Sequence, residues 1–392
     1  MVKTKSKVVC IVSVAKLDEY SGGVDRVGCF LIRYFKSRGY EIISYYWRSY
    51  TDNPEYFLID EVYQFPDDNL YSPKNTNKLI KIINQHNVSL IFDISFVGRI
   101  HEICYIAKEK CKIKSILLYQ GDPLSYTKSI IDRLSERRFL HTPLNERIKS
   151  IFKIPFSLFN RYYSAKKIHA QNMFWGDLYV VLSQYYVKEI INLLHISSTE
   201  KICTVSNAVE PFSIKKKKKQ VIFVGRMDWQ KRVDRLLRIW KIAQPYVPNW
   251  TLILVGDGPY MEKYKKYAEN ISLIGYKFVG SQPAQPFIEE SSILCVTSTH
   301  EGFGLTLVEA QSCGCVPIAF NSYAAIRDII DDGVSGMLIR PFSEKVFAKR
   351  LIELCKDLKK RESMASEGIQ SAKKFHPNII EQKWDSILDR LK

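Results

Sequence analysis

The chain of 392 residues has no apolar run that approaches the roughly 20 residues required for a helix to cross a bilayer. It also has no low-complexity tract, and its nine cysteines form no Cys-x-x-Cys pair. The first absence argues against an integral membrane protein, and the second argues against a disordered one. Because several cysteines lie in apolar stretches, we expect reduced, buried thiols, as in the cytoplasm.

The start of the chain does not resemble a secretion signal. Its first seven residues are basic, but the apolar stretch 8–15 has only the length of a strand and is followed at once by charged residues. No Asp-x-Asp pair follows a predicted strand, so no metal site is evident. We therefore expect a cytoplasmic protein whose chemistry uses no metal cofactor.

The length of the chain and its 46% hydrophobic residues favour two folded domains of nearly equal size. In the first half, apolar strands alternate with helical patterns, which predicts an α/β domain with a parallel sheet covered on both faces. The predicted strands are 8–15, 40–46, 88–94, 113–119 and 177–183, and the predicted helices are 24–37, 77–85, 100–110 and 184–194, the last capped by Ser183.

The second half predicts another Rossmann-like sheet. Its strands are expected at 221–224, 251–255, 271–274, 293–296 and 316–319. The five lysines at 215–219 precede it, and their mutual repulsion favours a solvated linker over a phosphate site. The predicted domains are therefore 1–205 and 206–374, followed by a helical segment, 375–392, with an apolar stripe.

The most informative stretch is residues 300–309, where a glycine-rich turn joins a strand to a helix. Such a turn directs free backbone amides and the positive end of the helix dipole at one point, which suits a phosphate group. The turn is bracketed by Glu301 and Glu309, whose carboxylates accept hydrogen bonds from sugar and ribose hydroxyls. The pattern therefore indicates that the turn binds a sugar nucleotide. The alternative is that Glu301 is a charge in a loop and Glu309 a charge on an exposed helix face, with no role in binding.

Two further motifs follow predicted strands. Strand 221–224 ends in Gly225-Arg226, and Lys231 comes five residues later. Strand 251–255 is followed by a Gly-Asp-Gly-Pro sequence that begins at Gly256. Because ligands of open α/β sheets bind at the carboxyl ends of the strands, Arg226 and Lys231 are well placed to contact an anion.

Together these motifs resemble the retaining glycosyltransferases of the group-one family. The resemblance implies the GT-B fold, in which two Rossmann-like domains face each other across a deep cleft. It implies transfer of a hexose or N-acetylhexosamine from a nucleotide-diphosphate sugar, with a UDP-sugar favoured by family frequency, and with retention of configuration. It also implies that Gly22, Gly23 and Asn207 face the donor, and that the last helix crosses back to the N-terminal domain.

The expected chemistry is electrostatic. The leaving diphosphate would be stabilised by Arg226, Lys231 and the first amides of the helix after the glycine turn. Glu301 would hold the donor hexose and Glu309 the ribose, with the base near Tyr276. The predicted catalytic residues are Arg226, Lys231 and Glu301, and the predicted donor-binding residues are Gly22, Gly23, Asn207, Gly256, Tyr276, Gly302, Phe303, Gly304, Leu305, Thr306 and Glu309.

The sequence departs from the family pattern at Gln120, where many relatives carry a histidine. Glutamine can hydrogen-bond a sugar hydroxyl, but it cannot act as an acid or base near neutral pH. Asp122 is a second candidate from the same loop for a sugar or acceptor contact. With Pro123 after it, Asp122 is equally suited to capping a helix.

The formal charge of +17 favours an anionic partner. Residues 128–167 carry ten basic and three acidic side chains interleaved with aromatics. That mixture is typical of a helix lying on an anionic membrane surface, although aromatics in a core beside solvated charges would also account for it. We therefore expect peripheral association with the inner face of the cell membrane and a lipid-linked, lipopolysaccharide or capsule glycan as acceptor.

Three other functions remain open. A sugar-nucleotide epimerase can share the fold, but it needs acid and base groups facing the hexose. A nucleic-acid-binding protein would explain the charge, yet no recognisable binding motif is present, so we expect no nucleic acid partner. A non-catalytic assembly partner would be compatible with Gln120.

Overall fold

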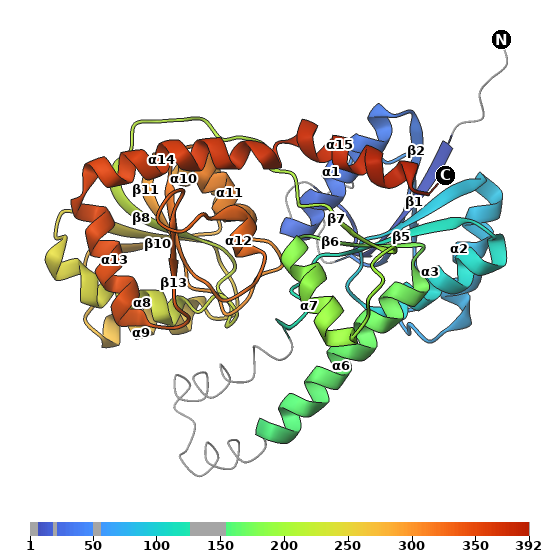
Figure 1. Ribbon diagram of the computed structural model, residues 1–392, viewed down its shortest axis with the longest axis horizontal. Coiled ribbons are helices and arrows are strands. Elements are labelled where there is room, and N and C mark those ends of the chain that lie inside the picture. The colour runs from blue at the N-terminus through green and yellow to red at the C-terminus, as the bar shows by residue number, and fades with distance from the viewer. Residues whose placement is uncertain (1–6, 19–21, 50–55, 126–153, 392) are drawn as a thin grey trace. The chain divides into compact units, whose positions relative to one another are not determined.

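The computed structural model of the chain describes residues 7–18, 22–49, 56–125 and 154–391 (Figure 1). The chain forms two compact units. Among the described residues, unit 1 contains those up to Pro123, residues Tyr162–Ala208 and those from Ile380 onward, and unit 2 contains 124–125, 154–161 and Val209–Ile379. The sequence-derived limits at residues 205 and 374 stay predictions of where independently folding domains end.

Unit 1 contains a parallel sheet with the strand order β3-β2-β1-β4-β5-β6-β7. The strands are β1 (Lys7–Ala15), β2 (Tyr40–Arg48), β3 (Glu61–Gln64), β4 (Val88–Asp93), β5 (Lys114–Tyr119), β6 (Leu178–Val181) and β7 (Ile202–Thr204). The helices that begin in this half of the chain are α1 (Gly23–Ser37), α2 (Pro73–His86), α3 (Gly98–Cys111), α6 (Ile154–Trp175) and α7 (Gln184–Leu194). The predicted cap of α7 is confirmed, because the hydroxyl of Ser183 accepts a hydrogen bond from the amide of Tyr185 at 3.1 Å.

The last helix, α15 (Pro377–Asp389), belongs to unit 1 from Ile380 onward and contacts Tyr34 of α1. Its apolar stripe is buried, and the ring of Trp384 meets Phe92 of β4 edge-on, with 5.2 Å between centroids. Beside that contact, the Arg38 guanidinium donates to Asp385 at 2.7 Å, and the hydroxyl of Tyr34 donates to the same carboxylate at 2.9 Å. Apolar and charged contacts together therefore attach the end of the chain to unit 1.

Unit 2 contains a second parallel sheet with the order β10-β9-β8-β11-β12-β13. The strands are β8 (Lys218–Val224), β9 (Thr251–Val255), β10 (Tyr276–Gly280), β11 (Ser291–Val296), β12 (Val316–Phe320) and β13 (Met337–Ile339). The helices are α8 (Val233–Ala243), α9 (Met261–Asn270), α10 (Gln285–Glu290), α11 (Leu305–Ser312), α12 (Ile326–Ile329), α13 (Glu344–Lys356) and α14 (Leu358–Ala372), with 3-10 turns at Gln244–Tyr246 and Lys373–Phe375. In Figure 1, α8, α9 and α13 lie on one side of this sheet, and α11 and α14 lie on the other.

One predicted strand of unit 2 is wrong, and the lysine run is a linker only in part. The apolar stretch 271–274 is not a strand, because Ser272 and Gly275 adopt left-handed conformations that turn the chain between α9 and β10. The lysine run is exposed at four of its five residues, as predicted, but only its first three residues precede the sheet, because β8 already begins at Lys218. The amine of Lys215 lies 2.7 Å from the buried carboxylate of Glu289, so part of the repulsion that favoured a linker is neutralised.

In both sheets the strand order reverses next to the first strand, between β1 and β4 in unit 1 and between β8 and β11 in unit 2. The loops that follow two such strands leave the sheet in opposite directions and open a crevice at its carboxyl edge. In unit 2, the loops that follow β8 and β11 carry Arg226, Lys231 and the glycine-rich turn. The topology therefore brings the strongest sequence motifs to the reversal point.

Candidate functional site

The centre of the candidate site in unit 2 is an ion pair between the loops that follow β8 and β11. The Nζ atom of Lys231 lies 2.6 Å from Oε1 of Glu301, and the two side chains are 23% and 12% exposed. A half-buried pair that still faces solvent is accessible to a ligand. It also loses less attraction to screening than a fully exposed pair does.

The backbones of these two loops are joined by hydrogen bonds. The side-chain amide of Gln230 donates to the carbonyl of His300 at 2.8 Å, and the carbonyl of Gln230 accepts from the amide of Thr299 at 2.9 Å. The hydroxyl of Thr297 donates to the carbonyl of Lys231 at 3.1 Å. These contacts hold Lys231 and Glu301 together through their backbones as well as through their charges.

The amino terminus of α11 lies at the end of the glycine-rich turn. Its cap residue, Gly304, has φ of 101°, and a Cβ there would come within 2.5 Å of the hydroxyl of Tyr323. The amide of Leu307 donates to the carbonyl of Gly304. Within the described part of the chain, the amides of Leu305 and Thr306 have no hydrogen-bond acceptor. Two free amides at the positive end of a helix form a suitable site for an anion.

The other residues of the turn differ in exposure. Gly302 is half-buried, whereas Phe303 is buried and meets Phe375 edge-on at 5.4 Å, so its side chain belongs to the packing of unit 2. Glu309, on the second turn of α11, is only 4% exposed. A carboxylate buried to this extent requires polar partners, which protein groups and the hydroxyls of a ligand can supply.

The Gly-Asp-Gly-Pro sequence packs against the loop that follows β8. A Cβ on Gly256 would overlap the carbonyl oxygen of Gly225, and one on Gly258 would come within 2.8 Å of the carbonyl of Met227. The amide of Met227 donates a hydrogen bond to the carbonyl of Asp257 in this loop at 2.8 Å. The glycines are therefore required for close approach of the two loops, which positions the neighbouring Arg226.

Arg226 itself is exposed and, among the described residues, forms no ion pair. The next arginine, Arg232, is 1% exposed, pairs with Asp234 at 2.9 Å and lies over the ring of Trp229 at 4.1 Å. The sequence analysis did not predict this buried pair, although Arg232 and Asp234 directly follow Lys231 and are separated by one residue. Arg232 immediately precedes α8 and has a left-handed backbone conformation, with φ of 50°. Its ion pair with Asp234 stabilises the turn that positions Lys231.

Tyr276 is not brought together with the other predicted donor-binding residues. It begins β10 and pairs with Leu252, near the amino end of β9. The carboxyl end of β10 is Gly280, whose carbonyl accepts from the amide of Gly256. Four residues of strand separate Leu252 from Gly256, which is roughly 13 Å. The predicted strand 271–274 would have ended just before Tyr276 and placed it at the carboxyl edge of the sheet. Because β10 instead begins at Tyr276, the residue at that edge is Gly280.

In unit 1, the structure brings two of the predicted residues together. The side-chain amide of Asn207 donates to Oε1 of Gln120 at 3.2 Å. The Nε2 of Gln120 is buried and has no hydrogen-bond acceptor among the described residues. Asp122, in the same loop, is buried. An amide donor left without an acceptor is available to a hydroxyl oxygen of a ligand.

Gly22 caps α1 and Gly23 begins it, and both are exposed. In the first turn of this helix lies Asp25, which sequence reasoning missed. Burial, together with the neighbouring carboxylate of Asp18, raises the pKa of Asp25 to about 6. A carboxyl with a raised pKa beside a flexible glycine pair is a candidate proton acceptor or hydroxyl ligand, and its only sequence signal was its place in the first helical turn.

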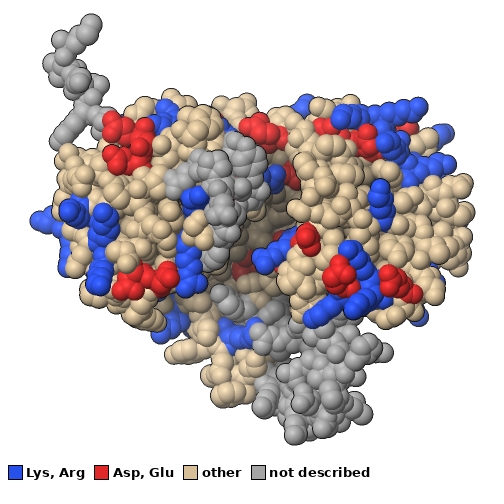
Figure 2. Space-filling view, turned by 180° about the vertical axis from the view of Figure 1, so that it is seen from behind, with Lys and Arg blue, Asp and Glu red and all other residues tan. Residues whose placement is uncertain are grey.

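Most of the basic, aromatic segment 128–167 lies outside the described residues, and its described part belongs to α6. Several aromatic side chains of α6 are exposed: Phe156, Phe159, Tyr162, Tyr163 and Phe174. On the face shown in Figure 2, lysines and arginines form small groups interleaved with carboxylates. No helix among the described residues has the length and apolar character needed to span a membrane.

Known proteins resemble this chain over nearly its whole length. Residues 206–371 match the family model of glycosyl transferases group 1. The chain is similar to the amylovoran biosynthesis glycosyltransferase AmsD of Erwinia amylovora, with 23% identity over 94% of this chain and 96% of that protein. It is also similar to the lipopolysaccharide 1,6-galactosyltransferase of Escherichia coli K12, with 31% identity over 50% of this chain and 57% of that protein.

Among solved structures, the chain resembles Alr3699/HepE of Anabaena in complex with UDP. The TM-score is 0.71 at 17% identity, and the match covers 98% of this chain and 99% of that one. A likeness of this kind over both units shows the fold, and the predicted α/β architecture is confirmed. Residues 206–371 therefore belong to the glycosyltransferases of group 1, and the chain as a whole has the GT-B fold.

Proposed function

We propose that this glycosyltransferase moves a hexose or N-acetylhexosamine from a UDP-sugar to a lipid-linked, lipopolysaccharide or capsule glycan, with retention of configuration and without a metal ion. The observation that carries the proposal is the pair between Lys231 and Glu301 at the strand reversal of unit 2, beside the free amides of α11. A cation, a carboxylate and two amide donors at one edge match the diphosphate and sugar of such a donor.

Breaking the anomeric C–O bond leaves an oxocarbenium-like sugar and a nucleoside diphosphate with extra negative charge. In the proposed mechanism, Arg226 binds diphosphate oxygens with its guanidinium fork, and Lys231 acts as a point charge. The amides of Leu305 and Thr306 add donors that need no reorganisation. Because these groups are fixed before the bond breaks, they stabilise the leaving group more than water would.

The two carboxylates bind the neutral parts of the donor. Glu301 accepts hydrogen bonds from hexose hydroxyls, and its negative charge stabilises the positive sugar as the bond breaks. Glu309, buried on α11, accepts hydrogen bonds from the ribose hydroxyls. In this division neither carboxylate binds the phosphates, which it would repel.

The choice of UDP is supported by the Anabaena protein of similar fold, whose solved structure contains bound UDP. The choice of a surface glycan is supported by the names of the relatives from Erwinia amylovora and Escherichia coli. In the proposal, the exposed aromatics of α6 hold the enzyme at an anionic membrane where such acceptors are assembled.

The test measures transfer of labelled sugar from UDP-glucose, UDP-galactose and UDP-N-acetylglucosamine to a glycolipid extract, with and without EDTA. We expect transfer from one donor, unaffected by EDTA and lost in Lys231→Met. The matched control is Lys263→Met on α9, a lysine that lies 4.6 Å over the ring of Tyr260. Full activity of Lys231→Met would contradict the assigned site, and loss of activity in EDTA would contradict the metal-free mechanism.

A further inference from the structure

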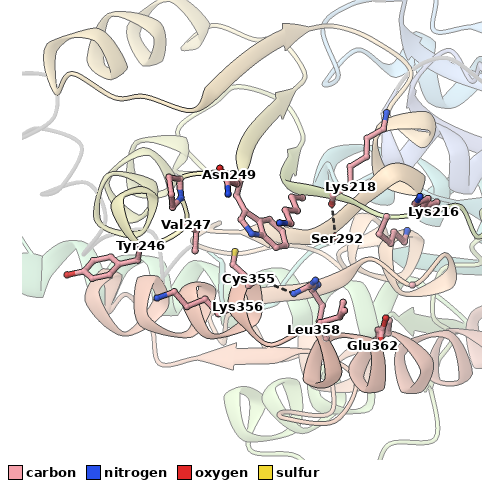
Figure 3. Close-up of a pocket in the computed structure, with 17 residues that line it drawn as sticks. Lys216, Lys218, Tyr246, Val247, Asn249, Ser292, Cys355, Lys356, Leu358 and Glu362 are labelled. Atoms are coloured by element: carbon pink, nitrogen blue, oxygen red, sulfur yellow. Dashed lines mark hydrogen bonds between the residues drawn. The ribbon is translucent and has the colours of Figure 1, made fainter.

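A second cavity lies in unit 2, far from Lys231 and Glu301. Its volume is about 740 Å³, within the range of small-molecule sites. It is lined by the lysine run at the start of β8, by residues just before β9 and by the junction of α13 and α14 (Figure 3). The cavity therefore lies at the amino edge of the parallel sheet. The seven residues of β8 separate that edge from the Gly225 loop by roughly 20 Å.

The lining of the cavity is strongly basic. Its cations are Lys216, Lys217, Lys218, Lys219, Lys356 and Arg361, and its single carboxylate is that of Glu362. Three neighbouring carboxylates are already engaged: Glu289 binds Lys215, Glu290 binds Lys218, and Asp357 accepts from the amide of Lys360 at the start of α14. Among the described residues, the cations of the lining therefore outnumber the carboxylates that can neutralise them.

These cations have different roles. Lys217 donates to the carbonyl of Glu289 at 2.7 Å, and Arg361 donates to the carbonyl of Cys355 and lies 5.0 Å from the ring centre of Trp250. Both are thus held by the walls of the cavity. In contrast, among the described residues the amines of Lys216 and Lys219 have no carboxylate within ion-pair distance.

Like Lys216 and Lys219, Lys356 has no carboxylate within ion-pair distance among the described residues, and its amine lies 5.7 Å from the ring centre of Tyr246. Figure 3 shows Lys356 and Tyr246 on one side of the cavity and Lys216 on the other, with Cys355 between them. Two exposed apolar surfaces, the ring of Tyr246 and the side chain of Leu358, border the same space. Amines on opposite walls suit one multiply charged group, and the apolar border suits the body of the molecule that carries it.

We propose that this cavity binds a phosphoryl-bearing ligand, whose phosphate oxygens pair with Lys216, Lys219 and Lys356. A phosphate group offers several oxygens and up to two charges, enough to engage three amines, whereas a single carboxylate does not. The phosphate belongs either to a small soluble molecule or to a lipid headgroup. The proposal is independent of the donor site, because the two sites lie at opposite edges of one sheet.

The experiment is lysine footprinting by brief acetylation of the full chain, read by mass spectrometry. One arm adds inorganic pyrophosphate, another adds phosphatidylglycerol vesicles, and the references are sodium chloride of equal ionic strength and phosphatidylcholine vesicles. The control lysines are Lys263 and Lys266 of α9, which are also exposed in unit 2. This readout is local, so pyrophosphate bound near Lys231 does not affect it.

We expect the acetylation of Lys216, Lys219 and Lys356 to slow at least threefold relative to the controls. Slowing in pyrophosphate assigns the site to small phosphorylated molecules, and slowing only with phosphatidylglycerol assigns it to a lipid headgroup. Equal labelling in all arms would overturn the proposal.

A variant tests whether the three amines act together. In Lys216→Ala/Lys219→Ala, both changes are at exposed positions, so folding should be unaffected, and the protection of Lys356 should disappear. The variant Lys263→Ala/Lys266→Ala should keep that protection. If Lys356 stays protected in the first variant, the amines do not form one site and the proposal is wrong.

Discussion

The ammonium group of Lys231 and the carboxylate of Glu301 are 2.6 Å apart, although 70 positions separate them in the chain. Within the structure each charge neutralises the other. A diphosphate that enters the site must therefore compete with Glu301 for Lys231, while the same carboxylate becomes available to a sugar hydroxyl. The pair links binding of the phosphates to binding of the sugar.

This linkage predicts opposite effects of Glu301→Gln on binding and on transfer. Removing the carboxylate charge releases Lys231 to the phosphates, so UDP should bind several-fold more tightly. Sugar transfer should fall by about 100-fold or more, because the charge that stabilises the positive sugar is lost. Calorimetry with UDP and a transfer assay measure the two effects. Weaker binding of UDP in Glu301→Gln would contradict the proposed competition.

Gly256→Ala should destabilise unit 2 severely. A methyl group there overlaps the carbonyl of Gly225 at a backbone φ of 130°, so the loops after β8 and β9 must separate. We expect a loss of about 3 kcal/mol or more, or insoluble protein, by analogy with other strained or overpacked positions. Gly98→Ala, in open space at the start of α3, is the control and should unfold as the wild type does in urea.

Asp25→Asn should stabilise the protein at neutral pH and leave it unchanged near pH 4. The pKa of Asp25 is raised from 3.8 to about 6, so the folded protein favours the protonated carboxyl. Stability from this group is therefore present below pH 4 and is lost as the pH rises through 6. Because Asp25 is partly exposed, we expect a gain of about 1 kcal/mol at pH 7.5. Urea unfolding at both pH values measures it, and an equal gain at both would contradict the assigned titration.

Trp384→Ala should loosen α15 from unit 1. The indole is buried against Phe92, and its loss should cost about 3–5 kcal/mol of the free energy of unfolding of unit 1. Asp385→Ala should cost less, because its pairing with Arg38 is partly exposed. Lys383→Ala, at an exposed position of the same helix, is the control. Hydrogen exchange of α15 would show which contact holds the helix, and unchanged protection in Trp384→Ala would contradict this account.

Phe159→Ser/Tyr163→Ser should weaken co-sedimentation with anionic vesicles. Both rings on α6 are exposed, and their replacement should remove apolar area that inserts between lipids. We expect at least a fivefold loss of vesicle affinity. Tyr71→Ser, at an exposed position outside α6, is the control. Equal affinity of both variants would remove the support for membrane docking through α6.

Local features followed from the sequence because neighbouring residues decide them. The helix after the glycine turn, the cap at Ser183 and the strand Thr251–Val255 lie where they were predicted. In each case the signal was short-range: a glycine able to adopt positive φ, a hydroxyl before a helix, or a β-branched run before Gly256. The same kind of signal failed at residues 271–274, where Ser272 turned an apolar run into a loop.

What the tertiary structure decided was which distant residues meet. Strand order places β8 beside β11, and only this order brings Lys231 to Glu301. Because β10 begins at Tyr276, this residue lies at the opposite edge of the sheet from Gly256. The packing of α13 and α14 beside the lysine run forms the basic cavity. The sequence alone determined the chemical groups and the local turns that present them. Their juxtaposition depends on pairings between segments far apart in the chain, which no local pattern of residues encodes.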